Sequence, residues 1–364
     1  MWLPTRSGGS GAAKPIVAPP PSPSGQALAL NPRCELLVSH PLNRPERGAA
    51  MRLIEREEVA HRLTYRACIP IVRQAMIDFS RGRTRQLLRS IIPLAHGHMF
   101  GVMPGALGES APFGAKLISV YPENFSKGRQ SHQGLVVLFE PATGEPVCIV
   151  HAGEITAIRT AAASAAATDA LARPDARRLA VLGYGEQAAT HVRALLQVRP
   201  IQSVRIWGRS RDRADAFCQR MHAELGVVLT SAPDVADLVS DADIICTVTA
   251  AREPVLKGAW VRPGTHINVV GSGFAGPAEV DTDLVARSRF IVDSREGVLQ
   301  QGAEFLRAKR AGVIDDAHIV AEIGQVFSGD VIGRESPADI TIYKSLGHVV
   351  QDLACAWALY ADAV

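Results

Sequence analysis

The segment from 179 to 188, LAVLGYGEQA, constrains the fold of this chain more than any other. A short apolar run ends in the pattern G-x-G-x-x-A, and a stretch rich in alanine, leucine and valine follows. Gly183 permits a tight turn, Gly185 lets the backbone approach a pyrophosphate, and Ala188 allows a helix to pack closely on the strand. Because the first N–H groups of a helix are free to bind phosphate, the segment predicts a dinucleotide site, with a purely steric turn as the alternative. The expected cofactor contacts here are Gly183, Tyr184, Gly185, Gln187 and Ala188.

The next predicted strand, 203–208, ends at the sequence Arg209-Ser210-Arg211. A site for NAD usually has an acidic residue near this position, which binds the 2′-hydroxyl of the ribose. Arginine instead suits a 2′-phosphate, which its planar guanidinium can bind through two hydrogen bonds. We therefore expect NADPH as the cofactor, with NADH also admitted, and we expect these three residues to contact it. The alternative is that the two arginines belong to a solvated helix start.

Strands alternate with helices between residues 176 and 294, and this order predicts a doubly wound parallel sheet of the Rossmann type, an α/β fold. Helices are expected to begin near residues 186, 211 and 233. The strand ends of such a sheet face the ligand crevice, so Thr247, Val248 and Thr249 after the fourth strand are expected to contact the cofactor. The predicted strands are 179–183, 203–208, 226–230, 243–248, 266–271 and 289–293.

Residues 51–175 predict a second, smaller α/β domain. Thr156 is expected to be the N-cap of a helix that runs to about Leu171. Arg159 and Thr160 would then lie in its first turn, where an anion is favoured. The elements expected before this helix are a helix at 65–79, strands at 114–121, 134–139 and 147–150, and a hairpin turn at 141–144.

The two ends of the chain complete the predicted domain organisation. Residues 1–50 are rich in Pro, Gly, Ser and Ala and lack the apolar core of a secretory signal, so we expect a disordered leader. A translation start at Met51 accounts for this leader more simply than a targeting role does. From Gly302 onward the chain reads as helical. We therefore expect residues 315–364 to return to the first domain, which leaves residues 176–314 as the nucleotide-binding domain.

The composition argues against several classes of function. A net charge of +3 and a low aromatic content give no basic surface for nucleic acid. No apolar run is long enough to span a bilayer, and no histidine or cysteine cluster has the spacing of metal ligands. The six cysteines are scattered without C-x-x-C pairs, which is typical of buried thiols in a reducing compartment. We therefore expect a cytoplasmic protein with no metal, no nucleic-acid partner and no membrane partner.

Ten motifs follow one another from residue 89 to residue 352. They are RSIIP (89–93), GVMPGAL (101–107), GAKLISVYPEN (114–124), SHQG (131–134), LFEPATGEP (138–146), ITAIRTAAASAAA (155–167), LGYGEQAATH (182–191), VRIWGRS (204–210), PGTHINVVGS (263–272) and KSLGHVVQD (344–352). In this order they resemble the ornithine cyclodeaminase/mu-crystallin family, over residue 52 to the end. The resemblance implies a nicotinamide-binding Rossmann domain, a smaller α/β domain that carries substrate and dimer contacts, and a homodimer.

The resemblance also implies a site for a small imino or amino acid, whose carboxylate is held by a lysine and two arginines. By motif these are Lys116 of GAK, Arg89 of LLRS and Arg159 of AIRTAA, with Lys116 as the catalytic residue. Arginine can bind a carboxylate through two hydrogen bonds, and lysine offers a point charge and a proton. A surface cation is the alternative for each, least so for Lys116, which lies in the apolar strand AKLISV. The motifs further imply His132 near the nicotinamide, unless it is a structural histidine, and Ser131, Thr160 and Ser345 at the cofactor.

Two glycines depart from the pattern of the true cyclodeaminases. Gly101 stands where those enzymes carry a carboxylate, and Gly273 stands where they carry a catalytic aspartate. Because cyclisation needs proton carriers within reach of a distal amine, these departures favour the reductase side of the family. We expect NADPH-dependent reduction of a cyclic ketimine acid, of the Δ1-pyrroline-2-carboxylate or Δ1-piperideine-2-carboxylate type, by hydride transfer to the imine carbon. The alternatives are an ornithine cyclodeaminase or amino-acid dehydrogenase of the same family, and a protein that binds NADPH and a small carboxylate without turnover.

Overall fold

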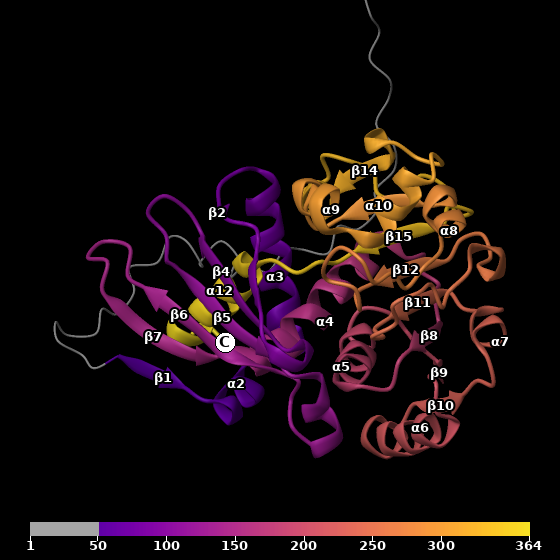
Figure 1. Cartoon of the computed structure of the whole chain (residues 1–364), viewed down its shortest axis with the longest axis horizontal. Helices are drawn as coiled ribbons and strands as arrows, with labels where there is room; N and C mark the ends of the chain where they lie inside the picture. The colour runs from indigo at the N-terminus through magenta and orange to yellow at the C-terminus, as the bar shows by residue number, and fades with distance from the viewer. Residues whose placement is uncertain (1–50) are drawn as a thin grey trace, which may run out of the picture.

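The computed structural model describes residues 51–364, apart from the side chains of residues 125 and 126. The predicted leader, residues 1–50, lies outside the described residues. The described chain forms two α/β domains that lie side by side, each built on one sheet (Figure 1). Within residues 51–364, no helix combines the length and the apolar character needed to cross a membrane.

The larger sheet is all parallel, with the order β10-β9-β8-β11-β12-β15-β13-β14. The six strands predicted between residues 176 and 294 all belong to it, which confirms the doubly wound parallel architecture. Its strands are β8 (Arg178–Leu182), β9 (Ser203–Trp207), β10 (Val228–Ser231), β11 (Ile244–Thr247), β12 (His266–Val269), β13 (Arg289–Val292), β14 (Ile319–Glu322) and β15 (Thr341–Lys344). The helices between them are α5 (Glu186–Leu195), α6 (Arg211–Leu225), α7 (Val235–Val239), α8 (Thr282–Arg287), α9 (Arg295–Gln301), α10 (Ala303–Arg310) and α11 (Ile323–Phe327).

The smaller sheet is mixed, with the order β1-β7-β6-β5-β4-β2, and β3 pairs with β4. Its central strands and the hairpin between β6 and β7 form as predicted. Helices α4 and α12 pack on its inner face, and α3 packs against both of them. The strands are β1 (Arg52–Ile54), β2 (Arg85–Gln86), β3 (Ser90–Pro93), β4 (Met99–Ala106), β5 (Phe113–Val120), β6 (His132–Phe139) and β7 (Pro146–His151). The helices are α2 (Arg56–Arg62), α3 (Tyr65–Ser80), α4 (Ala152–Leu171) and α12 (Val349–Tyr360).

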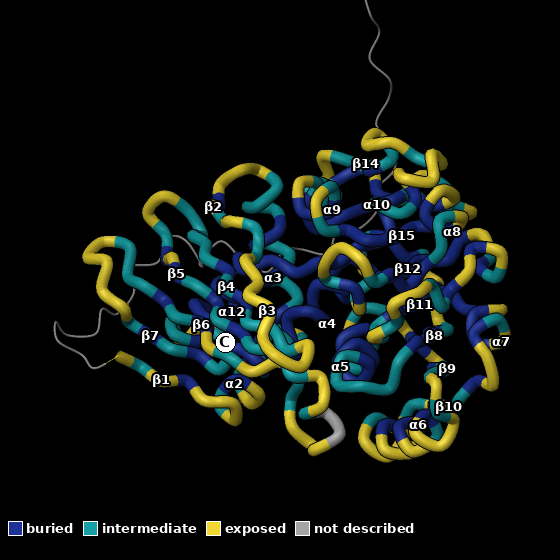
Figure 2. The backbone as a smooth tube through the Cα atoms, viewed as in Figure 1, coloured by how far each residue is buried: buried dark blue, intermediate teal, exposed yellow. Residues whose placement is uncertain are grey.

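The outer face of the smaller sheet is apolar and open to solvent. Side chains alternate along β5, so that Lys116 points to the buried face while Phe113 points to the outer one. Leu53, Phe113 and Leu135, from three different strands, are all exposed. Figure 2 shows that β3 is exposed along its length. An apolar sheet face that no element within residues 51–364 covers indicates an interaction surface.

Helix α4 begins five residues earlier than predicted, with its N-cap at 151 instead of 156. Nδ1 of His151 accepts a hydrogen bond from the backbone N–H of Glu154 at 3.1 Å, so His151 is the N-cap. The prediction that Thr156 caps this helix is therefore wrong. Arg159 and Thr160 consequently lie in the helix interior rather than in its first turn. They cannot use the free N–H groups of the helix start to bind an anion, and only their side chains are available for that role.

The same helix lies between the two domains and is buried along nearly its whole length (Figure 2). Its sequence is dominated by alanine and other small residues. Ala162 and Ala163 belong to the core of the smaller domain, whereas Ala161 and Ala165 belong to a core of the larger domain. Small side chains on every face allow both domains to approach this helix closely.

The end of the chain departs from the predicted domain assignment. Residues 315–364 were expected to return as a whole to the first domain, but β14 and β15 are strands of the larger sheet. Only α12 packs on the smaller sheet (Figure 1). The reason is that β15 inserts between β12 and β13, where its four buried residues complete the parallel sheet.

Candidate functional site

The predicted glycine turn has the geometry of a phosphate-binding turn. Gly183, directly after β8, has a φ of +124°, and a Cβ there would lie 2.9 Å from the carbonyl oxygen of Val248. Gly185 is the N-cap of α5, and no atom lies within 4 Å of the position its Cβ would take. The first N–H groups of α5 therefore have no side-chain cap and room for an anion beside them. Ala188 is fully buried, as the packing of the helix on β8 requires.

Tyr184 and Gln187, the other two residues predicted in this turn, flank it. The ring of Tyr184 lies over Gly208, where any Cβ would be 2.2 Å from the ring carbon Cε1. The amide oxygen of Gln187 is buried and has no hydrogen-bond partner among residues 51–364. Because an unsatisfied buried acceptor is destabilising, this oxygen is suited to accept a hydrogen bond from a ligand.

The end of β9 presents a free arginine beside the turn. Arg209 is exposed and makes no hydrogen bond or ion pair with any residue in the described part of the chain. The hydroxyl of Ser210 caps α6 by accepting from the N–H of Arg213 at 3.4 Å. Arg211 lies 3.6 Å from Asp215, one turn along the same helix. Arg209 is thus the arginine of this segment best placed to bind a phosphate.

The residues after β11 are held by a buried carboxylate that the sequence did not single out. Glu279 accepts hydrogen bonds from the hydroxyl of Thr247 at 2.8 Å and from the N–H and hydroxyl of Thr249 at 2.6 and 2.7 Å. The N–H of Gly271 donates to it at 2.7 Å. Burial raises the pKa of Glu279. Both threonine hydroxyls therefore bind the protein, while Val248 contributes its backbone to the wall of the glycine turn.

The predicted substrate residues Lys116 and Arg159 meet at one carboxylate. Lys116 lies on β5, Arg159 lies on α4, and both side chains are buried. Oδ1 of Asp352, on α12, accepts from Nζ of Lys116 at 2.9 Å and from Nε of Arg159 at 3.1 Å. Nζ of Lys116 also donates to the hydroxyl of Thr156 at 2.6 Å, and Nη1 of Arg159 donates to the amide oxygen of Gln351 at 3.0 Å. The structure thus brings the two cations together around Asp352.

The charge states of these groups follow from burial and from each other. Burial lowers the pKa of Lys116 to about 8, against the raising effect of Asp352. Burial alone would raise the pKa of Asp352, but the charges of Arg159 and Lys116 outweigh it and hold this pKa below its ordinary value. At neutral pH the pair is therefore an ammonium and a carboxylate.

Arg89 reaches the same region from the segment before β3. Its Nη1 donates to the carbonyl oxygen of Gly273 at 3.1 Å, and its Nη2 donates to the carbonyl oxygens of Leu346 and Gly347, the latter at 3.2 Å. Burial and the charge of Arg159 lower its pKa. We call Arg89, Lys116 and Arg159 the cation cluster. Arg89, which belongs to the smaller domain, is thus oriented by backbone carbonyl groups of the larger domain.

The segment after β15 is held in place by hydrogen bonds to a buried carboxylate. Oδ2 of Asp293, a buried residue after β13, accepts hydrogen bonds from the N–H groups of Leu346 and Gly347, at 2.5 and 2.7 Å. Gly347 has a φ of +81°, and a Cβ there would lie 2.8 Å from Nη1 of Arg159. Only glycine fits this conformation without strain, and only glycine leaves room for the guanidinium.

The remaining predicted residues, Ser131, His132, Thr160 and Ser345, differ in how far they are buried. His132 is exposed at the start of β6, and Ser131 lies 2.9 Å from its Nδ1. The residue keeps part of its surface in contact with solvent, but desolvation of its ring, followed by the charges of Lys116 and the two arginines of the cluster, holds the pKa of His132 below its ordinary value, so the ring is neutral at pH 7. Thr160 is buried on α4 beside Arg159, and Ser345 is buried directly after β15.

The two glycines that depart from the cyclodeaminase pattern both lie at this site. Gly101 on β4 is buried on the same face of the sheet as Met103, which pairs with Lys116. A Cβ at Gly273 would lie 3.1 Å from Nη1 of Arg89. Neither position offers a carboxylate, so Asp352 is the acidic group that contacts the cluster through its side chain.

Four residues of the site were given no role from the sequence: Gln351, Asp352, Asp293 and Glu279. Gln351 and Asp352 are adjacent polar residues in the otherwise apolar helix VVQDLACAWALY, which is a usable signal. Asp293 and Glu279 each follow or precede ordinary loop residues and carry no such mark.

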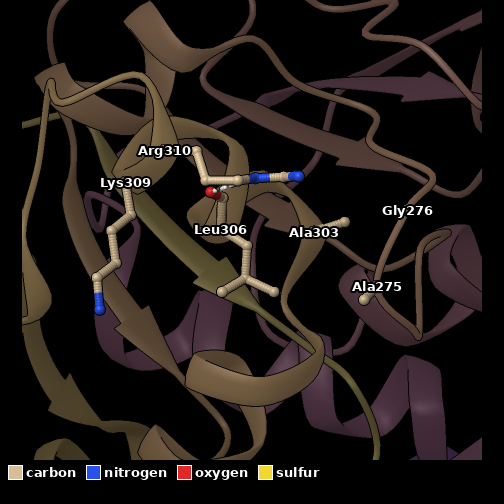
Figure 3. Close-up of a pocket in the computed structure, with 6 residues that line it drawn as sticks. All are labelled: Ala275, Gly276, Ala303, Leu306, Lys309 and Arg310. Carbon is tan, nitrogen blue, oxygen red and sulfur yellow. Dashed lines mark hydrogen bonds between the residues drawn. The ribbon is translucent and has the colours of Figure 1, made fainter.

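A surface hollow of about 730 Å³ lies elsewhere on the nucleotide-binding domain (Figure 3). Figure 3 shows the side chain of Lys309 pointing away from Ala275 and Gly276, and its ammonium is bound to Asp316 at 2.6 Å. None of the predicted cofactor or substrate residues lines this hollow. We therefore do not assign it to the candidate site, despite its volume. Its lining consists of Ala275, Gly276, Ala303, Leu306, Lys309 and Arg310.

Comparison with known proteins shows which family has this sequence. A profile of the ornithine cyclodeaminase/mu-crystallin family matches residues 50–364. The ketimine reductase mu-crystallin of Mus musculus is 36% identical over 299 residues, which cover 80% of this chain and 90% of the mouse protein.

Solved structures agree with this match. The Δ1-pyrroline-2-carboxylate reductase of Thermococcus litoralis, in complex with NADH and L-proline, is 34% identical with a TM-score of 0.82, covering 86% of this chain and 98% of that one. An archaeal alanine dehydrogenase dimer with bound NAD is 29% identical with a TM-score of 0.80, covering 86% and 96%. The chain is accordingly an NAD(P)H-dependent oxidoreductase that acts on carbon–nitrogen bonds. It belongs to the ornithine cyclodeaminase/mu-crystallin family.

Proposed function

We propose that this protein reduces cyclic ketimine carboxylates of the Δ1-pyrroline-2-carboxylate or Δ1-piperideine-2-carboxylate type with NADPH. The observation that carries the proposal is the cation cluster, since three neighbouring cations, two of them buried, need an anionic ligand. The names of the mouse ketimine reductase and of the Thermococcus pyrroline-carboxylate reductase support this substrate class.

Counting hydrogen-bond donors shows how the substrate carboxylate would be held. Nζ of Lys116 carries three N–H groups, of which Thr156 and Asp352 accept two. Nη2 of Arg159 makes no hydrogen bond within residues 51–364, because Asp352 and Gln351 take Nε and Nη1. One N–H of the Lys116 ammonium and the Nη2 group of Arg159 are therefore left to bind the two oxygens of a carboxylate.

The same cluster would orient the imine for reduction. A bound nicotinamide supplies the hydride when the dinucleotide is present. The carboxylate, fixed by Lys116 and Arg159, sets the position of the neighbouring imine carbon, and orientation of this kind contributes much of the rate. Lys116, with its pKa lowered to about 8, is an ammonium that can release a proton near neutral pH, which suits it to protonate the imine nitrogen.

NADPH is proposed rather than NADH because of Arg209. The turn at Gly185 fits a pyrophosphate of either cofactor, but Arg209 is an exposed cation with no partner in residues 51–364. A 2′-phosphate is the group that distinguishes the two cofactors, and a guanidinium binds it well.

Three other functions remain as alternatives, and specific residues argue against the first of them. Cyclisation of ornithine would need proton carriers at positions 101 and 273, which are glycines. The likeness to the archaeal alanine dehydrogenase keeps oxidative deamination of an acyclic amino acid as the second candidate. Binding of NADPH and a carboxylate without turnover would use the same cation cluster, so only an assay separates it from catalysis.

We propose that the protein works as a homodimer in the cytoplasm. The exposed apolar side chains Leu53, Phe113 and Leu135 on the outer face of the smaller sheet support a second copy as the covering layer. The archaeal alanine dehydrogenase, a dimer, supports the same state. Cys68, Cys148, Cys218, Cys246 and Cys355 are free and buried, in keeping with a reducing compartment.

The proposed function is tested by following NADPH oxidation with a panel of cyclic ketimine acids, acyclic oxo acids plus ammonia, and no substrate. Turnover of the cyclic acids well above that of the acyclic ones is the expected result. Turnover confined to acyclic oxo acids would favour the amino-acid dehydrogenase. Tight NADPH binding without turnover of any of them would favour the binding protein.

A further inference from the structure

A buried carboxylate lies inside the cation cluster, and the proposed function gives it no role. Asp352 is fully buried on α12, with Oδ1 shared between Lys116 and Arg159. Its Oδ2 is also buried and has no hydrogen-bond partner among residues 51–364. A carboxylate in this place competes with a substrate carboxylate for the same donors, so its presence needs a reason.

The reason lies in the repulsion between the cations. Lys116, Arg159 and Arg89 come from β5, α4 and the segment before β3. The charge of Arg159 lowers the pKa of both Lys116 and Arg89, and the charge of Arg89 also lowers the pKa of Lys116. Asp352 is the one carboxylate within hydrogen-bond reach of two of them in residues 51–364. Its single oxygen Oδ1 draws an ammonium and a guanidinium to one point from two different elements. Three cations against one carboxylate then leave an excess of positive charge for a substrate anion.

We propose that Asp352 is a positioning residue of this enzyme, which holds Lys116 and Arg159 at the spacing of a substrate carboxylate and keeps Lys116 protonated. The inference rests on the proposed function of the cation cluster as the carboxylate site. Asp352 satisfies one donor on each cation and leaves the adjacent donors free. The site is thereby assembled before the substrate arrives, which reduces the free-energy cost of binding.

The surrounding charges fix the direction of the expected pH effect. Arg159 and Arg89 face Lys116, and His132 lies near the cluster from β6. Cys355 on α12 and Cys68 on α3 lie on the other side of Asp352. Burial and the two arginines lower the pKa of Lys116, and Asp352 alone opposes them. Removing its charge must therefore lower the pKa of Lys116 further.

The test is the pH profile of kcat/KM for a cyclic ketimine acid at saturating NADPH, in the full-length protein and in Asp352→Asn. In the unchanged protein, we expect the alkaline limb near pH 8, where Lys116 loses its proton. In Asp352→Asn, we expect this limb to move down by about one to three pH units. We also expect kcat/KM at neutral pH to fall about 10²-fold, chiefly through KM, with NADPH affinity unchanged.

The matched control is Asp243→Asn. Asp243 is also a buried carboxylate that accepts from arginines, but its partners are Arg173, Arg178 and Arg262, and it lies at the amino end of the central strand β11. We expect its variant to lose stability while the alkaline limb stays in place. A merely structural role for Asp352 would give the same result as this control, and that outcome would overturn the inference.

A second variant and a second measurement keep the test independent of folding and of the proposed function. Asp352→Glu keeps the charge but displaces it, so we expect the limb to stay near pH 8 while kcat/KM falls about tenfold; unchanged kcat/KM would overturn the inference.

Binding of pyrrole-2-carboxylate to the NADPH-loaded protein reports on the cluster without turnover. If no cyclic ketimine is reduced, the proposed function fails. The inference is still supported if, as the pH rises, Asp352→Asn loses its affinity for pyrrole-2-carboxylate at a lower pH than the unchanged protein does. The same pH dependence in both proteins would refute it.

Discussion

Replacing Gly347 by alanine tests whether the segment after β15 holds Arg159 in place. The φ of Gly347 is +81°, a conformation that costs an L-residue about 1–2 kcal/mol. Its new Cβ would also lie 2.8 Å from Nη1 and 3.1 Å from Nη2 of Arg159. Because Arg159 is buried and hydrogen-bonded to Asp352 and Gln351, the guanidinium can make room only by stretching those bonds.

The chain offers a control that carries the same strain without the clash. Gly329, an exposed residue after α11, has a φ of +79°, and no atom lies within 4 Å of the position of its Cβ. Gly329→Ala should lose about 1–2 kcal/mol of the free energy of unfolding, and Gly347→Ala should lose at least as much, because the clash with Arg159 adds to the strain. Only Gly347→Ala should lose kcat/KM for the imino acid, by about 10²-fold, because displacement of a positioning group by a fraction of an ångström is costly to catalysis.

The two variants are compared by thermal denaturation and by steady-state NADPH oxidation with a cyclic ketimine acid. NADPH affinity, measured by fluorescence titration, should be unchanged in both. A kcat/KM that falls equally in Gly347→Ala and Gly329→Ala would show that strain alone acts, and that Gly347 does not position Arg159.

Three further expectations concern the cofactor, the lysine and the rival reaction. Arg209→Asp should weaken NADPH binding by about ten- to a hundredfold and spare NADH binding; equal affinities for both cofactors in the unchanged protein would contradict the assignment. Lys116→Ala should nearly abolish turnover with NADPH affinity intact, whereas a folded variant that no longer binds NADPH would show that the lysine serves the cofactor. With L-ornithine and NAD or NADP, ammonia release should be far slower than reduction of cyclic ketimines, because Gly101 and Gly273 supply no proton carriers; comparable rates would favour a cyclodeaminase.

The nucleotide-binding half could be predicted from the sequence because its determinants are local. A strand, a glycine turn and a helix start lie within 179–188, and the structure forms each of them in place. The positions of the later strands along the chain followed from the same alternation of strands and helices. β15 was missed because its four residues, 341–344, run into the KSLG motif at Lys344 and read as part of a helical end. Its membership of the sheet depends on pairing with β12 and β13, which no local pattern shows.

The substrate half depended on contacts between residues that lie far apart in the chain. Motif resemblance identified Lys116 and Arg159, but Asp352 lies 236 positions from the first and 193 from the second. The start of α4 was misplaced for a different reason. Capping preferences favour a hydroxyl such as that of Thr156, whereas the structure uses the imidazole of His151 as the acceptor.

Helix α4 has a consequence for how the molecule unfolds. Its alanines at 162 and 163 pack in one domain and those at 161 and 165 in the other, so neither domain has a complete core without it. Melting either domain alone would expose one side of a helix that the other domain still requires. The two domains should therefore lose structure in a single cooperative transition, and hydrogen exchange in α4 should proceed only through global opening.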